Sequence, residues 1–249
     1  MNLKPAWLLY RYLYLMQFDI HKALMRYKLK SISSSIKGNW LDIGAGDQPY
    51  KEYFAGAASY ATTNTKRHYS TQESERIDKL TTHWIEDGKA LPLPDNSLDG
   101  VACFQVLSVI DNPREFFTEI YRVLKPGGEF LLTTDFLYPV WSSEDRYRHT
   151  AFSIRNLSET NGFTVETIDS FGGFASTLYS LFMRYMRSFP DIWKKKTSTG
   201  KIISGIIFLF LLVMLPLASV KGFIIFQTEK RKTKTTDFTF NIMLRAKKN

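Results

Sequence analysis

Short apolar runs alternate with longer polar or amphipathic stretches between about residues 39 and 246. Runs of four to eight residues rich in β-branched and aromatic side chains predict strands, and their alternation with helices is typical of a parallel sheet with crossover connections. The predicted strands are Trp40–Ile43, Ser59–Thr62, Thr82–Ile85, Leu98–Phe104, Glu129–Thr134, Phe163–Ser170 and Phe238–Ala246. We therefore expect an α/β fold with a doubly wound, mostly parallel, seven-stranded sheet.

The clearest predicted helix covers Pro113–Leu124. Asp111 or Asn112 precedes it as a candidate N-cap, and a proline at the first helical position is favourable. Lys125-Pro126-Gly127-Gly128 follows it, a sequence that ends helices.

Residues 1 to about 30 interleave apolar and aromatic side chains with lysine and arginine, and Asp19 is the one acid among them. We do not expect a secretory signal, because Arg11 interrupts the apolar stretch and no small-residue cleavage site follows. The pattern predicts an amphipathic helix. Such a helix either lies on a membrane surface or packs on the core of the domain, and the sequence leaves both interpretations open.

Ile202–Val220 is the second unusual stretch, since only Ser204, Gly205, Pro216 and Ser219 interrupt its apolar side chains. As a helix it would be roughly 28 Å long, about the thickness of a bilayer core. Both flanks are basic, with net charges of +5 over residues 184–201 and +4 over residues 221–234. Positive flanks tend to stay on the same, cytoplasmic side.

The last predicted strand must also rejoin the sheet that contains the first. We therefore expect a monotopic or re-entrant insertion through about residues 202–226 at the cytoplasmic face of a membrane, rather than a single crossing. A buried helix or a dimer interface in a soluble protein is the alternative interpretation. The expected organisation is an amphipathic helix (1–35), a core (36–172), a basic and hydrophobic insertion (173–236) and a final strand (237–249).

Composition narrows the possible partners. The chain has 249 residues, a net charge of +9 and one cysteine, Cys103, so a disulfide-stabilised scaffold is excluded. Excess positive charge suggests a negatively charged partner. Because the basic clusters flank the apolar segment, we expect an anionic membrane surface and no nucleic acid.

The most informative motif is Asp42-Ile43-Gly44-Ala45-Gly46, at the end of the first predicted strand. Glycines at alternate positions let the backbone approach a ligand closely, and we expect the turn to open a helix whose amides face that ligand. Pro49 stands where a dinucleotide-binding fingerprint has its third glycine. Asp42 can pair with a cationic group of the ligand.

This motif resembles the first motif of the class I S-adenosylmethionine-dependent methyltransferases, specifically their type 11 branch. Three further blocks are similar to that family in the same order: Glu86–Val101, Gln105–Leu107 and Tyr121–Gly128. The resemblance implies methyl transfer from S-adenosylmethionine and a Rossmann-like fold with an antiparallel final strand. One branch that the chain resembles farther along frequently has a hydrophobic insertion before that strand.

The resemblance also implies roles for individual residues. Gly44 and Gly46 would wrap the methionine part of the cofactor, and Asp87 and Gly88 would receive its adenine. The implied cofactor-binding residues are Asp42, Gly44, Gly46, Asn64, Asp87, Gly88 and Gln105. Asn64 stands near the position at which many relatives carry an acid for the ribose hydroxyls.

The segment Asp145–Thr150 resembles a branch whose substrates include glycans and lipid-linked intermediates. The acceptor is accordingly expected to be a small or lipid-linked molecule. Tyr138 and Arg148 are the candidate acceptor-binding residues, and His149 is the candidate general base because its pKa is suitable. The alternatives are an ion pair of Arg148 with Glu144 or Asp145 and a structural role for His149.

Some family residues are absent. At positions 64 and 108, where relatives commonly carry acids, the chain has Asn64 and Ser108. Trp141 stands where relatives often have a histidine. A non-catalytic, membrane-anchored scaffold is therefore the alternative function. His21, His68 and His83 share no metal-ligand spacing with Cys103, and we predict no metal.

Overall fold

The computed structural model describes residues 19–65, 71–85, 90–140, 143–193, 210, 214, 217–231 and 239–249. Its contacts divide the chain into two units. Residues 26–171 and 233–249 make up the sheet unit, and residues 1–25 and 172–232 make up the second unit. Each unit is considered by itself below.

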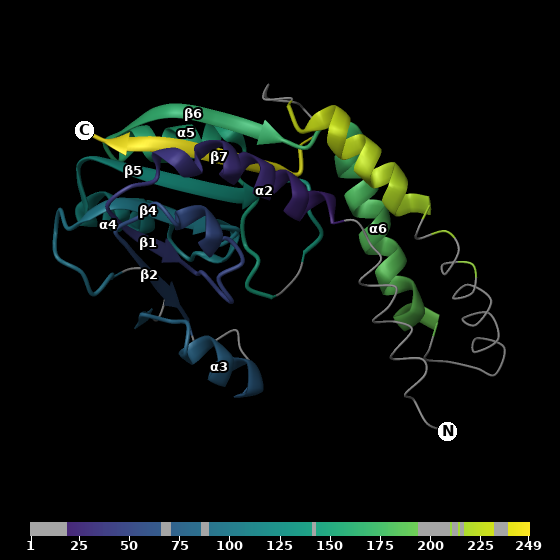
Figure 1. The fold of residues 1–249 in the computed structure, drawn as a ribbon, viewed down its shortest axis with the longest axis horizontal. Coiled ribbons are helices and arrows are strands. Elements are labelled where there is room, and N and C mark those ends of the chain that lie inside the picture. The colour runs from purple at the N-terminus through teal and green to yellow at the C-terminus, as the bar shows by residue number, and fades with distance from the viewer. Residues whose placement is uncertain are drawn as a thin grey trace. The chain divides into compact units, whose positions relative to one another are not determined.

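The sheet unit contains seven strands in the order β3-β2-β1-β4-β5-β7-β6 (Figure 1). The strands are β1 (Asn39–Ile43), β2 (Ser59–Asn64), β3 (His83–Trp84), β4 (Leu98–Phe104), β5 (Leu124–Asp135), β6 (Phe163–Phe171) and β7 (Asn241–Lys248). Strands β1 to β5 pair in parallel, whereas β7 is antiparallel to both β5 and β6. The predicted fold and the return of the final strand are confirmed.

The strand order reverses between β1 and β4, which are neighbours although two strands separate them in sequence. Asp42 near the end of β1 pairs with Thr62 on one side and Ala102 on the other. In open α/β sheets, ligands bind outside the carboxyl ends of the strands at such a switch point. The glycine motif follows β1 at this point.

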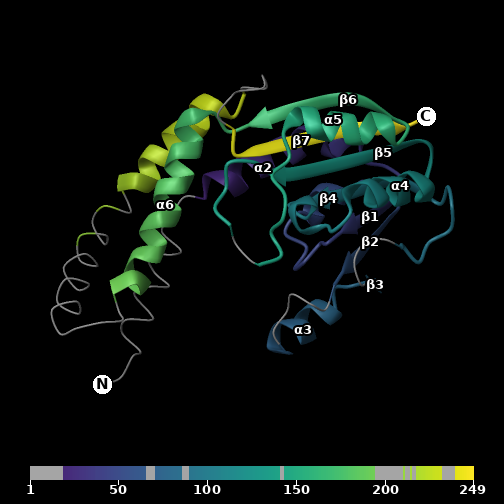
Figure 2. The same cartoon turned by 180° about the vertical axis from the view of Figure 1, so that it is seen from behind.

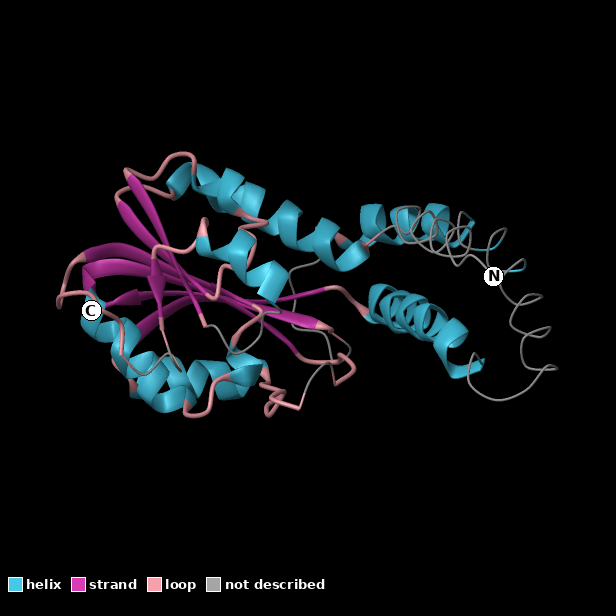
Figure 3. Ribbon diagram, turned by 90° about the horizontal axis from the view of Figure 1, so that it is seen from below, coloured by secondary structure: helices cyan, strands magenta, loops and turns pink. Residues whose placement is uncertain are grey.

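Helices lie on both faces of the sheet. The helices are α2 (Ile20–Ile32), α3 (Thr71–Asp78), α4 (Pro113–Val123), α5 (Ala151–Thr160) and α6 (Phe174–Trp193), with short 3-10 turns η1 (Ser33–Ser35), η2 (Lys51–Phe54) and η4 (Leu107–Val109). Helices α4 and α5 cover one face (Figure 2), and the layers are visible from below in Figure 3.

Helix α4 confirms the helix predicted from the sequence. The Asn112 side chain accepts a hydrogen bond from Glu115 N, so Asn112 is the cap, and Phe117 and Ile120 are fully buried. The helix ends at Val123, and β5 begins at once with Leu124, five residues earlier than predicted. Leu124 pairs with Leu98 before a register shift, which extends the strand through the glycine turn.

The prediction that the glycine motif opens an α-helix is wrong. Turns follow β1 and lead into the short 3-10 turn η2. Gly44, Gly46 and Gln48 have positive φ angles of 70°, 55° and 57°, which an α-helix cannot accommodate. Pro49 then removes a backbone donor.

The first 18 residues of the predicted amphipathic helix lie outside the described ranges. In the sheet unit, the second half of α2 packs on the core: Leu29 is fully buried, and Lys28 Nζ lies 3.5 Å from Asp169 Oδ2 on β6. For these residues the packed interpretation is the observed one.

Among the described residues, no helix has both the length and the apolar character required to cross a membrane. Most of the segment predicted to insert lies outside the described ranges, in residues 202–209, 211–213 and 215–216.

Candidate functional site

The glycine motif forms a tight loop fastened to the end of β2. Gly44 N and Ala45 N donate to Thr63 O at 2.9 and 3.2 Å, and Gly46 N donates to Asn64 Oδ1 at 2.8 Å. A Cβ atom on Gly44 would lie 2.5 Å from Cγ2 of Val106, which follows β4. The absence of a side chain at Gly44 therefore lets the ends of β1 and β4 approach closely.

Asp42 lies just before this loop and is buried, with 2% of its surface exposed. Its Oδ2 accepts a hydrogen bond of 2.6 Å from the Tyr60 hydroxyl, and its Oδ1 has no hydrogen-bond partner among the described residues. Burial raises the pKa of Asp42 from 3.8 to about 7, and the Tyr60 hydrogen bond lowers it in part. A buried carboxylate with an unsatisfied oxygen is suited to a cationic ligand group.

Asn64 is buried at the end of β2, where it holds the loop. Its Oδ1 accepts from Gly46 N, and its Nδ2 donates to Thr81 Oγ1 at 2.8 Å. The Thr81 hydroxyl itself donates to Ile77 O at 2.7 Å. These contacts link the glycine loop through Asn64 to the chain before β3. A contact of Asn64 with a ribose stays a prediction.

Gln105 directly follows β4, has a positive φ of 62° and lies in a polar cluster at the carboxyl ends of β4 and β5. With its amide oxygen towards Thr133 Oγ1 at 3.0 Å, its nitrogen donates to Asp135 Oδ1 at 2.6 Å. Asn241, at the start of β7, is fully buried beside it. Asp135 and Asn241 were missed by the sequence reasoning, because nothing in the local sequence signals that either of them meets Gln105, and Asn241 is 136 residues away.

The acceptor candidates lie in the segment after β5. The Arg148 guanidinium pairs with both carboxylate oxygens of Asp145, which raises the pKa of Arg148. Its Nη2 also donates to Tyr138 O at 3.4 Å. The ion-pair alternative for Arg148 is therefore observed, with Asp145 rather than Glu144 as the partner.

His149 is nearly buried, with 7% of its surface exposed. Its Nδ1 lies 3.0 Å from Ser153 Oγ, and its Nε2 is buried with no hydrogen-bond partner among the described residues. Burial lowers the pKa of His149, which favours the neutral imidazole. A neutral ring with one unengaged nitrogen can accept a proton.

The backbone of Ser108 anchors this segment. Ser108 O accepts hydrogen bonds from Arg146 N at 2.9 Å and Tyr147 N at 3.2 Å. Arg146 also pairs with Asp111 at 2.5 Å. Segment 145–149 is thereby fixed against the exit of β4, and the role of position 108 does not depend on an acidic side chain.

The remaining sequence candidates lie outside the residues that the structure describes. Asp87 and Gly88 fall in residues 86–89, and Trp141 in residues 141–142, all outside the described ranges. Over the part of the chain that the structure describes, no group of three or more His, Cys, Asp or Glu side chains is placed to hold a metal ion. Cys103 is buried in β4, and burial raises its pKa, as expected for a packing residue.

Comparison with known proteins agrees with this geometry. Residues 41–132 match the family model described as a methyltransferase domain. These residues belong to the class I S-adenosylmethionine-dependent methyltransferases. The match begins within β1, so it includes the glycine loop, and it extends to β5.

Two curated relatives cover shorter parts of the chain. A probable S-adenosylmethionine-dependent methyltransferase of Mycolicibacterium smegmatis is 40% identical over 91 residues, 34% of this chain and 35% of the relative. A malonyl-[acyl-carrier protein] O-methyltransferase of Marinomonas sp. is 40% identical over 63 residues, 24% of this chain and 23% of the relative. The methyltransferase matches thus span about a third or less of these relatives.

Among solved structures, a methyltransferase of Bacillus halodurans superposes with a TM-score of 0.52 at 17% identity. The superposition covers 89% of this chain and 97% of that chain. At this identity the likeness concerns the fold alone.

Proposed function

We propose that the chain is an S-adenosylmethionine-dependent methyltransferase that acts at a membrane surface on an amphipathic acceptor, either lipid-linked or glycan-bearing. The observation that carries the methyltransferase part is Asp42, whose buried, unsatisfied oxygen lies beside the glycine loop at the switch point of the sheet. S-Adenosylmethionine carries an ammonium group and a sulfonium, and a buried carboxylate compensates such charge.

In this proposal Asp42, Gly44 and Gly46 hold the methionine part of the cofactor, with Asp87 and Gly88 at its adenine. Asn64 and Gln105 keep the ends of β2 and β4 in position around it. Bound there, the cofactor supplies a methyl group carried on a positively charged sulfur. The thioether that remains after transfer is a good leaving group. The protein must therefore position the acceptor and remove its proton.

His149 is the proposed general base for a hydroxyl acceptor. Support comes from its lowered pKa and from the unengaged Nε2. Tyr138 and Arg148 would border the acceptor, and Arg148 would meet an anionic group while still paired with Asp145. This arrangement favours a phosphate or carboxylate on the acceptor, although the ion pair reduces its net attraction.

The membrane part of the proposal rests on residues 172–232. Ten lysines and arginines and two acids lie there, a net charge of +8 out of the +9 of the whole chain. Large apolar side chains are exposed in the same unit, including Phe182, Leu217 and Phe223. Basic charge beside exposed apolar surface is the combination by which peripheral proteins bind anionic bilayers.

Calorimetry with S-adenosylmethionine tests the cofactor site. We expect binding by the full chain, and at least a tenfold loss of affinity in Asp42→Ala and Gly44→Arg. Asp47→Ala is the matched control, since Asp47 lies in the same loop but is exposed and pairs with Arg76. No heat at millimolar cofactor would instead favour the non-catalytic scaffold, the alternative suggested by Asn64 and Ser108.

Detection of labelled methyl groups in lipid and polysaccharide extracts tests the acceptor class. Label in a lipid-linked or glycan fraction supports the proposal. Label found only on acyl carrier protein would point to the substrate named for the Marinomonas relative.

A further inference from the structure

Helix α6 and the helical residues 217–229 pack against each other at two points in the second unit. The buried carboxylate of Glu229 accepts hydrogen bonds from Gly173 N at 3.0 Å and Ser176 N at 3.1 Å, and from the Ser176 hydroxyl. These amides belong to the start of α6, so Glu229 caps it. Farther along the pair, a Cβ atom on Gly222 would lie 2.4 Å from the Tyr179 ring. The cap and this close approach fix the spacing of the two helices.

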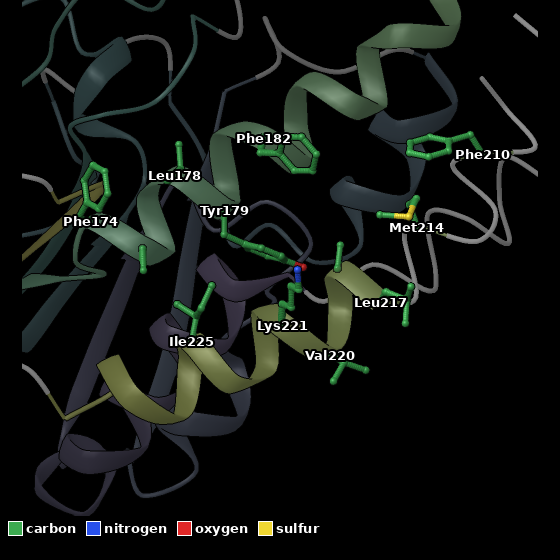
Figure 4. A pocket seen from close by; sticks show the side chains of 12 residues that line it. Phe174, Leu178, Tyr179, Phe182, Phe210, Met214, Leu217, Val220, Lys221 and Ile225 are labelled. Atoms are coloured by element: carbon green, nitrogen blue, oxygen red, sulfur yellow. The ribbon is translucent and has the colours of Figure 1, made fainter. Parts of the chain in front are cut away.

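A cavity of about 830 Å³ lies in the second unit along this helix pair. We call it the helix-pair groove; its lining includes Leu178, Tyr179 and Phe182 on α6 and Leu217, Ala218 and Lys221 on the helical residues 217–229. Figure 4 shows the side chains that line it. Leu178, Phe182 and Leu217 are each more than half exposed. Its volume lies in the range of small-molecule pockets, and its apolar walls suit a hydrocarbon.

Among the described residues that line the groove, Lys221 is the one with a charged side chain. Figure 4 shows its amine and the hydroxyl of Tyr179 pointing toward each other. The stem of a lysine packs on apolar surface while its ammonium remains available to an anion. The groove therefore combines an apolar channel with a single cation.

The net charge of this part of the sequence selects among the possible occupants. Residues 172–232 carry a net charge of +8, and Glu229, one of the two acids there, is buried in the helix cap. A second copy of this chain would bring two strongly basic segments together, which like-charge repulsion opposes. An anionic amphiphile matches both the charge and the apolar walls.

From these features we propose that the helix-pair groove binds the hydrocarbon chain of an anionic membrane lipid, whose head group pairs with Lys221. The inference rests on the proposed action at a membrane surface and adds to it a site for a single lipid chain. It explains why apolar side chains on both helices face a preformed space instead of packing against each other.

The test uses calorimetry of the full chain with hexyl, octyl and decyl phosphate, each below its aggregation concentration. Burying a methylene group strengthens binding by about fourfold, so affinity should rise by about that factor for each carbon added. Lys221→Gln should weaken binding of every alkyl phosphate by about fivefold and leave this dependence on chain length unchanged.

Ala218→Trp fills the groove and should abolish the dependence on chain length. Phe223→Trp is the matched control, because Phe223 is half exposed on the same helix but does not line the groove. An affinity independent of chain length, or binding only above the aggregation concentration, would overturn the inference. A dimer that Ala218→Trp dissociates would also overturn it, since a second copy would then fill the groove.

Flotation with phosphatidylglycerol-containing vesicles separates this inference from the proposed function. Vesicle binding without alkyl phosphate binding would overturn the groove as a lipid-binding site and leave the proposed action at a membrane surface standing. Alkyl phosphate binding without vesicle binding would overturn the membrane lipid as occupant. Cofactor binding and methyl transfer are measured independently of both results.

Discussion

Asp42 is a carboxyl group that burial holds partly protonated near neutral pH. Its pKa of about 7 in the folded protein exceeds the ordinary 3.8, so the folded state binds more protons than the unfolded state between these values. Its ionisation therefore costs stability as the pH rises from about 4 to about 7. A cationic ligand reverses this preference, because it favours the carboxylate.

The first prediction is that Asp42→Asn raises stability while it weakens the binding of S-adenosylmethionine. The amide keeps a partner for the Tyr60 hydroxyl and removes the buried charge, so unfolding above pH 7 should cost roughly 1–3 kcal/mol more than in the wild type. Thermal unfolding at pH 5 and pH 8 checks this, with the larger gain at pH 8. In the wild type, cofactor affinity should fall as the pH is lowered through about 7.

Asp99→Asn is a control for which we expect the opposite change in stability. Hydrogen bonds from Asn39 N and Lys125 lower the pKa of Asp99, so its carboxylate stabilises the fold above its ordinary pKa and this contribution is lost as the pH falls. We expect Asp99→Asn to destabilise the protein at pH 8. If Asp42→Asn destabilised the protein at pH 8, the buried Asp42 carboxylate would not be a cost to the fold, and its assignment to a cationic ligand would be refuted.

The contacts of Asn64 suit an amide better than a carboxylate. The Thr81 hydroxyl donates its proton to Ile77 O and presents a lone pair to Asn64 Nδ2. A carboxylate at position 64 would face that lone pair without a donor. The hydrogen bond to Gly46 N is compatible with either side chain.

The second prediction is that Asn64→Asp destabilises the protein by roughly 1–3 kcal/mol, the cost of an unsatisfied buried polar group. The loss should increase with pH as the new carboxyl ionises, and cofactor affinity should fall because the glycine loop loosens. Thermal unfolding and calorimetry at pH 6 and pH 8 measure the two effects. Full stability together with tighter cofactor binding would instead indicate that position 64 contacts the ribose directly.

At the scale of elements, the pairing of β1 with β4 depends on a glycine. A Cβ atom on Gly100 would lie 2.3 Å from the Trp40 ring, which is 2% exposed. The aromatic ring thus occupies the space above Gly100 and holds the two strands on either side of the switch point. Because the glycine loop follows β1, this packing also determines where the loop lies.

The third prediction is that Gly100→Ala destabilises the fold by roughly 1–3 kcal/mol through overpacking. Urea unfolding is the measurement. Gly127→Asn is the control: Gly127 has open space where a Cβ would be, and asparagine tolerates its positive φ of 77°. Equal effects of the two substitutions would contradict the packing argument.

At the scale of the whole molecule, charge is distributed very unevenly. Residues 172–232 carry a net charge of +8, whereas the rest of the chain carries 23 basic and 22 acidic residues. The rest of the chain taken together is therefore nearly neutral, and the basic region is separate in sequence from residues 41–132, which match the methyltransferase domain.

The fourth prediction is that binding to vesicles containing phosphatidylglycerol weakens as salt is raised but does not vanish. Salt screens the attraction of the basic region, whereas burial of apolar side chains is not screened. Flotation at 50 and 500 mM salt measures the difference, with neutral phosphatidylcholine vesicles as the control. Complete release at 500 mM salt would show that only electrostatic attraction operates.

Much of the fold could be predicted because its signals are local. Strand β4 has the bounds that its apolar run predicts, and α4 begins after a predicted cap and ends one residue before its predicted end. The glycine motif likewise marked the end of β1. Arg148 shows where prediction from sequence stopped, since Glu144 and Asp145 were equally placed in the sequence and only the folded backbone selects Asp145.

The sequence by itself determined the strands, the capped helix, the cofactor motif and the basic, apolar character of residues 172–232. These features depend on side-chain periodicity, backbone preference and charge within a few residues. The tertiary structure alone decided that β7 lies between β5 and β6, that Asn64 supports the glycine loop and that Gln105 meets Asp135 and Asn241. These contacts join segments far apart in the chain, and their geometry exists only after the sheet has brought the strand ends together.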